Sequence, residues 1–219
     1  MPLFTMNRTS NHRLQRNAPH VTAAASGPLP FRHRAAAALC GRWAWVIVQE
    51  LDVTFRVHRT VPNSERTILF EWGPDIFEGS LYNLQWRPTD YHVIGYLEGH
   101  PVTHVGIVAH RVKVGSTKKL VGGIGAVVTV PKHQKRGLAK ECLKWAHGYM
   151  KSNLRVEFGF LFCPERLLEF YESVGWKRVK ENVLVDQPRG KVIAPICAMV
   201  LELSEAWPSG PIDLDSYPW

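Results

Sequence analysis

The sequence lacks an apolar run of the roughly 20 residues that a membrane-spanning helix needs, so no membrane segment is expected. It is also poor in cysteine, with no CxxC pair and no Cys/His cluster at metal-ligand spacing, so neither a zinc site nor a disulfide framework is expected. Scattered thiols instead fit a reduced, cytoplasmic protein. The cysteines are Cys40, Cys142, Cys163 and Cys197.

Acidic residues are missing from residues 1–49, which carry six arginines and therefore a charge of +6. The whole chain has a formal net charge of +8, so residues 50–219 contribute only about +2. Because the body of the protein is nearly neutral, its basic isoelectric point does not indicate a nucleic-acid partner.

Residues 1–42 form a separate, low-complexity segment that is rich in Arg, Ala, Ser and Pro. Such a segment is typical of a disordered tail, of leader sequence upstream of a later start, or of an organelle transit peptide. We place the folded domain at residues 43–219, with a first strand expected at Trp43–Val48 and a short helix and loop within Glu65–Asn83.

Three apolar runs joined by short turns containing glycine predict an antiparallel meander. The strands are expected at His92–Leu97, Val102–Val114 and Leu120–Val130. After Pro131 the period changes, because Leu138, Cys142, Trp145 and Tyr149 recur at steps of four, three and four residues, which is one face of a helix.

The nearly continuous apolar run Val156–Phe162 predicts a strand buried on both faces. A helix connects it to the third strand of the meander, so the two should be parallel neighbours. A second helix is expected at Pro164–Val174, a short strand at Trp176–Val179, and a final hairpin between Val183–Val185 and Val192–Leu203. The order predicts an α/β fold: a mixed, mostly antiparallel sheet with helices on both faces.

The segment most indicative of chemistry is the basic loop between the third strand and the first long helix. Unpaired N–H groups and the positive dipole end at a helix start form an anion site, and Gly137 lets the backbone approach a phosphate. We predict that this loop binds a pyrophosphate. The residues expected to bind the cofactor are Val128, Thr129, Val130, Gln134, Lys135, Arg136, Gly137, Leu138 and Ala139.

The pattern Gln134-x-x-Gly137-x-Ala139 after a strand resembles motif A of the GNAT acyltransferases, which bind acetyl-CoA through this loop. The run Leu168–Trp176 resembles the FYxxxGF/W element of the same family. The resemblance implies a sheet splayed between its fourth and fifth strands, with the pantetheine arm in the opening. It also implies acetyl-CoA as co-substrate.

Two subfamilies resemble the chain further. The segments Tyr91–Tyr96 and Thr103–Arg111, and a terminal tryptophan near acidic residues, are similar to aminoglycoside 2'-N-acetyltransferases. The segments Phe77–Gly79, Val112–Gly115 and Trp207–Gly210 are similar to nodulation-factor N-acyltransferases. Both subfamilies acylate an amine of an amino sugar, which implies a small-molecule amine acceptor of that class.

The sequence departs from both subfamilies where they carry a glutamate before the phosphate loop. The corresponding stretch, residues 122–126, holds only glycine, isoleucine and alanine. The candidate bases are therefore Glu78, His92 and His104, each of which is also compatible with an ordinary structural role. Tyr171 is the candidate general acid for the leaving thiolate, if its helix lies as in the family. Backbone N–H groups near Val128 are expected to hold the thioester oxygen.

An acidic C-terminus is the candidate acceptor site, with Asp213, Asp215 and Trp219 as its members, although a solvated tail is an equal interpretation. The sequence thus favours an acetyl-CoA-dependent N-acetyltransferase acting on an amino sugar or aminoglycoside-like amine. Two alternatives stay open: transfer of a longer acyl chain from an acyl carrier protein, and a non-catalytic CoA sensor. The final hairpin could also pair across a homodimer.

Overall fold

The structure is a computed structural model that describes residues 52–219. The predicted basic segment at 1–42 and the predicted strand at Trp43–Val48 lie outside the described residues. The strands are β1 (Val53–His58), β2 (Tyr91–Leu97), β3 (His100–Val114), β4 (Thr117–Thr129), β5 (Phe158–Cys163), β6 (Lys177–Arg178), β7 (Val183–Gln187), β8 (Gly190–Ile193), β9 (Cys197–Glu202) and β10 (Ile212–Asp213). The α-helices are α1 (Asn63–Phe70), α2 (Leu138–Ser152) and α3 (Leu168–Glu172). The 3-10 turns are η1 (Gly79–Tyr82), η2 (Pro131–His133) and η3 (Glu165–Leu167).

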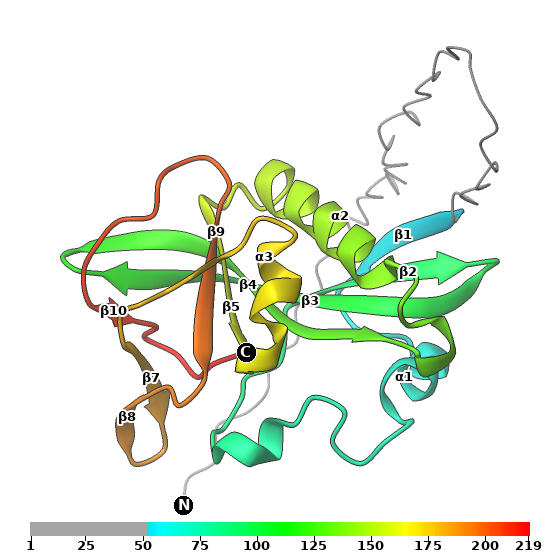
Figure 1. Cartoon of the computed structure of the whole chain (residues 1–219), viewed down its shortest axis with the longest axis horizontal. Coiled ribbons are helices and arrows are strands. Elements are labelled where there is room, and N and C mark those ends of the chain that lie inside the picture. The colour runs from blue at the N-terminus through cyan, green and yellow to red at the C-terminus, as the bar shows by residue number, and fades with distance from the viewer. Residues whose placement is uncertain (1–51) are drawn as a thin grey trace, which may run out of the picture. The chain divides into compact units, whose positions relative to one another are not determined.

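The predicted meander is confirmed: β2, β3 and β4 pair in antiparallel order, and β1 adds to the outer edge of β2 (Figure 1). Turns at Glu98-Gly99 and Gly115-Ser116 connect the three strands. The strand β3 is long enough to pair with β2 near its start and with β10 near its end. This long strand therefore links the two halves of the sheet.

The sheet opens between β4 and β5, as the resemblance to the GNAT acyltransferases implied. The two strands are parallel and pair only from Val121 with Phe158 to Ile124 with Leu161. Beyond Ile124, β4 continues along β3 as far as Thr129, whereas β5 continues along β9. Among the described strands, none consequently pairs with the edge of β4 that faces β5 over residues 125–129.

Helices cover both faces of the sheet, which also confirms the prediction. The helix α2 packs its buried residues Cys142, Leu143 and Ala146 onto a core that includes Val93 of β2. The neighbouring residue Ile94 points to the opposite face, because side chains alternate along a strand. There it joins a second core with Leu69 of α1.

The C-terminal part differs from the predicted hairpin in one respect. The hairpin β7–β8 forms, but the run Val192–Leu203 is not one strand, because Ala194 and Pro195 interrupt it. Proline has no N–H to donate to a sheet, so β8 ends at Ile193 and a new strand begins at Cys197. This strand, β9, crosses to pair antiparallel with β5 and β6.

The second predicted helix is also shorter than expected. The segment Pro164–Val174 forms the 3-10 turn η3 followed by α3, which spans only Leu168–Glu172. The strand predicted at Trp176–Val179 shortens to β6, because Trp176 is buried against Gly159 of β5 and not paired in the sheet. Both elements keep the predicted order, and Tyr171 of α3 packs in the same core as Leu161 and Cys163 of β5.

Candidate functional site

The basic loop joins β4 to α2 in a conformation that leaves its amides free. Lys135 and Gly137 both have positive φ, at 60° and 80°, which alternates the direction of successive N–H groups. The first helical amide with a backbone partner is Glu141 N, which donates to Gly137 O at 3.1 Å. Within the described residues, the six amides of residues 135–140 make no hydrogen bond. Six free donors at a helix N-terminus form a strong anion site.

Charge and space support the same interpretation of this loop. Lys132, Lys135 and Arg136 are exposed beside the free amides. A methyl group at Gly137 would meet nothing within 4 Å, so the space above this residue is open to a ligand. Gln134 has a different role, because its Nε2 donates to Thr129 O at 3.0 Å and closes the loop onto the end of β4. The side chains of Val128, Val130 and Leu138 are buried, so these residues can offer only backbone groups to a ligand.

A bulge in β4 marks the place where the sheet opens. The register between β3 and β4 shifts between His104 and Gly106, and Ala126 takes a positive φ of 48°. This conformation is uncommon for a residue other than glycine. It is held by a hydrogen bond of 2.7 Å between His104 Nδ1 and Ala126 O. The bulge therefore bends β4 at the point where its pairing with β5 ends.

The structure brings together two of the candidate bases, His92 and His104. Their rings lie on the α1 side of the sheet, with His92 Nδ1 3.0 Å from His104 Nε2. His104 is fully buried, and the ring of Phe70 packs edge-on against it with centroids 4.9 Å apart. His92 is only partly buried. Their spacing of twelve residues on adjacent strands offered no sequence signal of this contact.

Both histidines are held in the neutral form by their surroundings. Burial lowers the pKa of His104 to about 3, although the hydrogen bond to Ala126 opposes this change. Burial also lowers the pKa of His92, with further contributions from the charges of Arg66 and His58, whereas Asp90 raises it. His104 therefore serves as a neutral hydrogen-bonding group across the whole physiological pH range.

Tyr171, the candidate acid, is buried in α3 between Phe170 and Trp176. Burial raises its pKa, and the neighbouring Cys163 adds to the effect. Among the described residues, its hydroxyl has no hydrogen-bond partner. Burial therefore keeps this phenol protonated at neutral pH and also makes it a weaker acid.

Glu78, the third candidate base, does not join the histidines. It forms an ion pair with Arg166 of η3 at 2.5 Å, and its side chain is 42% exposed. Burial, followed by the charge of Glu78, raises the pKa of the nearby Tyr82. The Glu78–Arg166 pair therefore connects the segment between α1 and β2 to the segment that follows β5.

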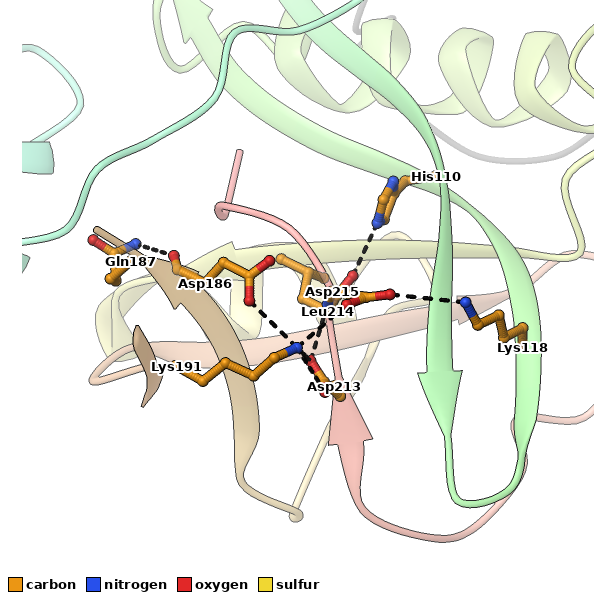
Figure 2. A network of polar contacts seen from close by, with 8 residues as sticks. All are labelled: His110, Lys118, Asp186, Gln187, Lys191, Asp213, Leu214 and Asp215. Carbon is orange, nitrogen blue, oxygen red and sulfur yellow. Dashed lines mark hydrogen bonds and ion pairs between the residues drawn. The ribbon is translucent and has the colours of Figure 1, made fainter. Parts of the chain in front are cut away.

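Asp213 and Asp215 belong to an ionic network, which Figure 2 shows. Lys191 Nζ lies 2.6 Å from Asp213, 3.3 Å from Asp215 and 3.3 Å from Asp186. Lys118 approaches Asp215 from β4 at 3.8 Å. The two candidate acceptor carboxylates are thus already engaged by lysines, which sequence reasoning missed.

Trp219 fills a slot over β4. Its indole is 6% exposed, and its Nε1 donates to Phe160 O at 3.3 Å. A methyl group at Gly123 would lie 2.1 Å from Trp219 Cε2, so only glycine leaves room for the ring. The glycine-rich stretch that stands where the subfamilies carry glutamate is therefore the floor of this slot.

Membrane-spanning helices and metal-binding clusters are both absent from residues 52–219. No helix in this range is long and apolar enough to span a bilayer. In the same range, no group of three or more His, Cys, Asp or Glu residues is arranged to hold a metal ion. The described cysteines Cys142, Cys163 and Cys197 are all free.

Comparison with known proteins gives one sequence match. Residues 77–179 match the model of the acetyltransferase (GNAT) domain family. This range runs from the loop before β2 to just after β6 and includes the basic loop before α2, the histidine pair and Tyr171. A search of curated proteins finds no match.

Solved structures of acetyltransferases are similar to this chain at low sequence identity. The GNAT N-acetyltransferase YhbS of Escherichia coli, solved with CoA, is 13% identical with a TM-score of 0.50, covering 84% of this chain and 94% of YhbS. A GNAT acetyltransferase of Brucella melitensis, solved with acetyl-CoA, is 12% identical with a TM-score of 0.45, covering 73% and 94%. E. coli ElaA is 15% identical with a TM-score of 0.44, covering 68% and 99%.

The sequence match and the architecture agree with one another. The domain model covers the elements that build the site, and the likeness to YhbS is one of overall fold. The open β4–β5 pair and the anion loop at the start of α2 are the features expected of that fold. The chain therefore has a GNAT fold around a segment, residues 77–179, that matches the acetyltransferase (GNAT) domain, and both findings support an acetyltransferase that uses acetyl-CoA.

Proposed function

We propose that this protein transfers the acetyl group of acetyl-CoA to a primary amine on an amino sugar or aminoglycoside-like acceptor. The observation that carries the donor half is the row of six free amides at residues 135–140, next to the unpaired edge of β4. A pyrophosphate on the loop would place the pantetheine arm along that edge. The acceptor half rests on the subfamily resemblance and on the surface described below.

Different groups would bind the thioester, protonate the leaving sulfur and hold the amine in place. Backbone N–H groups on the open edge near Val128 would bind the thioester oxygen and stabilise the charge that develops on it. Tyr171, protonated and beside β5, would give a proton to the departing sulfur. Holding the amine against the thioester would supply a further large share of the rate.

Aromatic side chains between α1 and η1 provide a surface suited to a sugar ring. Phe70 contacts His104 and is followed at 6.0 Å by Phe77, which is 43% exposed. Trp72 is 40% exposed on the same segment. A sugar has an apolar ring face and a polar rim, and aromatic rings with exposed faces match such a ligand. Asp213, Asp215 and Trp219 stay as proposed acceptor contacts, and binding through the two acids requires the amine to compete with Lys191.

The test is a free-thiol release assay with acetyl-CoA and a panel of amines. The panel holds aminoglycosides, glucosamine oligomers, polyamines and a lysine peptide. Release confined to amino sugars supports the proposal, and release with another amine replaces the acceptor class. Calorimetry with acetyl-CoA checks the donor separately, and no binding at millimolar concentration would overturn it.

Two variants make the donor test specific to the loop. Lys135→Ala together with Arg136→Ala should weaken acetyl-CoA binding at least tenfold, because each charged hydrogen bond contributes about 1.5–3 kcal/mol. Lys151→Ala, at the other end of α2, is the matched control and should leave binding unchanged.

Tyr171→Phe should lower the rate of acetyl transfer about 10–1,000-fold without weakening acetyl-CoA binding. Unchanged turnover would favour the sensor alternative. Transfer only from an acyl carrier protein would identify that carrier as donor.

A homodimer through β8 is a separate proposal. Among the described strands, β8 pairs only with β7, and its residues Val192 and Ile193 are 39% and 54% exposed. An edge strand with exposed apolar side chains favours pairing with a second copy. Light scattering should then give twice the monomer mass, and Ile193→Lys should restore the monomer. A monomeric wild-type protein would refute the proposal.

A further inference from the structure

The hydrogen bonds of the histidine pair determine where each proton lies. Ala126 O is a carbonyl and can only accept, so His104 Nδ1 must carry the proton that it donates at 2.7 Å. A neutral His104 then has a bare Nε2, which can only accept. His92 Nδ1, 3.0 Å away, must therefore be the donor. This leaves the lone pair of neutral His92 on Nε2.

The free nitrogen of His92 is available to a ligand. Within the described residues, Nε2 makes no hydrogen bond, and the side chain is partly exposed. The other contact of the ring is Thr89 Oγ1, 3.5 Å from Nδ1. His92 can take up a proton on Nε2 without breaking its bond to His104. This is the behaviour required of a general base that must return to its starting position after each turnover.

His92 also lies in the same row of paired residues as the point where β4 separates from β5. His92 is opposite Gly106 in β3, and Gly106 is opposite Gly125 in β4, the residue before the bulge. Adjacent strands are about 4.8 Å apart, so this row is about 10 Å long. His104 spans part of that distance, because its ring touches both Ala126 O and His92. The base is thus connected to the place where β4 leaves β5.

We propose that His92 is the general base of the acetyl transfer, acting through Nε2 directly or across one water molecule, and that His104 is the residue that positions it. This inference rests on the proposed function and supplies the base for which β4 has no side chain. The groups facing His92 are Arg66 of α1, His58 of β1, Asp90 before β2 and His104 of β3.

The proposed step balances in atoms and charge. The amine nitrogen forms a C–N bond with the thioester carbonyl carbon, and its excess proton passes to His92 Nε2. The C–S bond then breaks, the thiolate takes a proton from Tyr171 or water, and the carbonyl is restored. The imidazolium of His92 returns its proton to the solvent or to the tyrosinate. The products are the N-acetylated acceptor and free CoA.

The kinetic test follows kcat/KM against pH, with an amine that supports thiol release. In the wild type, the rate should fall about tenfold for each pH unit below the pKa of His92. His92→Gln should lower the plateau about 10²–10⁴-fold and abolish this acid limb. His100→Gln, which removes an exposed histidine at the start of β3, should keep both. An acid limb and a rate that survive in His92→Gln overturn the proposal.

A second measurement does not depend on activity. Long-range proton–nitrogen NMR of histidine-labelled protein at pH 7.5 should show both His92 and His104 with the proton on Nδ1. A proton on Nε2 of His92 overturns the proposal, even if acetyl transfer is observed. The variant His104→Phe keeps an aromatic ring but removes both ring nitrogens. In this variant, His92 should populate both tautomers, and the rate of acetyl transfer should fall. If no amine is acetylated, the proposed function fails, while the NMR result still decides the arrangement of the pair.

Discussion

Gly123 gives the sharpest test of how the C-terminal segment is held. A methyl group at this position would lie 2.1 Å from Trp219 Cε2 and 2.3 Å from Nε1, well inside van der Waals contact. The indole has no free space nearby, because it also contacts Phe160 and Phe162 of β5. We therefore predict that Gly123→Ala expels the indole from its slot.

The magnitude follows from the surface that the indole buries. A buried tryptophan removes about 150–250 Å² from water, which at about 25 cal/mol per Å² is about 4–6 kcal/mol. Measured losses for truncating a buried tryptophan are about 3–5 kcal/mol. Gly123→Ala should therefore lower the free energy of unfolding by about 3–5 kcal/mol, a large part of the 5–15 kcal/mol of a typical domain.

The assay is urea unfolding followed by circular dichroism, in a double-mutant cycle with Trp219→Ala. Once the indole is gone, the methyl group at position 123 has room, so the second substitution should cost less than about 1 kcal/mol. Gly148→Ala in α2 is the matched control, since a methyl group there meets nothing within 4 Å and alanine favours a helix. Additive losses in the cycle would refute the steric explanation.

Three other predictions follow from single contacts. Burial lowers the pKa of His104 to about 3, so the unfolded chain binds this proton first as the pH falls. The contribution of His104 to the free energy of unfolding should therefore decrease by about 1.4 kcal/mol for each pH unit below about 6.5. Urea midpoints at pH 5–8 should show a pH slope of stability that is smaller by this amount in His104→Phe than in the wild type. Burial raises the pKa of Cys163 to about 12, so iodoacetamide should label the less buried Cys197 first. Peptide mass spectrometry would show the order of labelling, and labelling of Cys163 first would contradict this prediction. Gln134→Ala removes the bond to Thr129 O and should weaken acetyl-CoA binding about fivefold in calorimetry, whereas unchanged affinity would mean that the loop does not need this bond.

The elements with a strong local pattern were predictable from the sequence. The alternating runs of the meander and the periodic face of α2 each depend on neighbouring residues only, and both match the structure closely. The position of the basic loop was also predictable, because Gly137 stands between a valine-rich strand and an amphipathic helix. Its local chemistry is independent of what packs elsewhere.

The long-range pairings were not predictable in the same way. The strand β9 joins β5 across 33 or more intervening residues, and nothing in Cys197–Glu202 specifies that partner. Pro195 was a usable signal that the preceding run ends, since proline interrupts a strand. The bulge at Ala126 had no such signal, because a positive φ at alanine is maintained by His104 and not by its own side chain. The histidine pair was therefore accessible only from the structure.

The glycine-rich stretch of β4 explains why a base is absent from that strand. A side chain at Gly122 would strike Met150 of α2, at 2.3 Å, and one at Gly123 would strike Trp219 on the other face. Both faces of the strand are thus occupied by core side chains, and a glutamate there would have to displace one of them. A base for the proposed reaction must consequently come from outside this stretch of β4. On β2, the unpaired Nε2 of His92 meets that requirement, because the bond to His104 fixes its tautomer and the row through Gly106 connects it to the opening of the sheet.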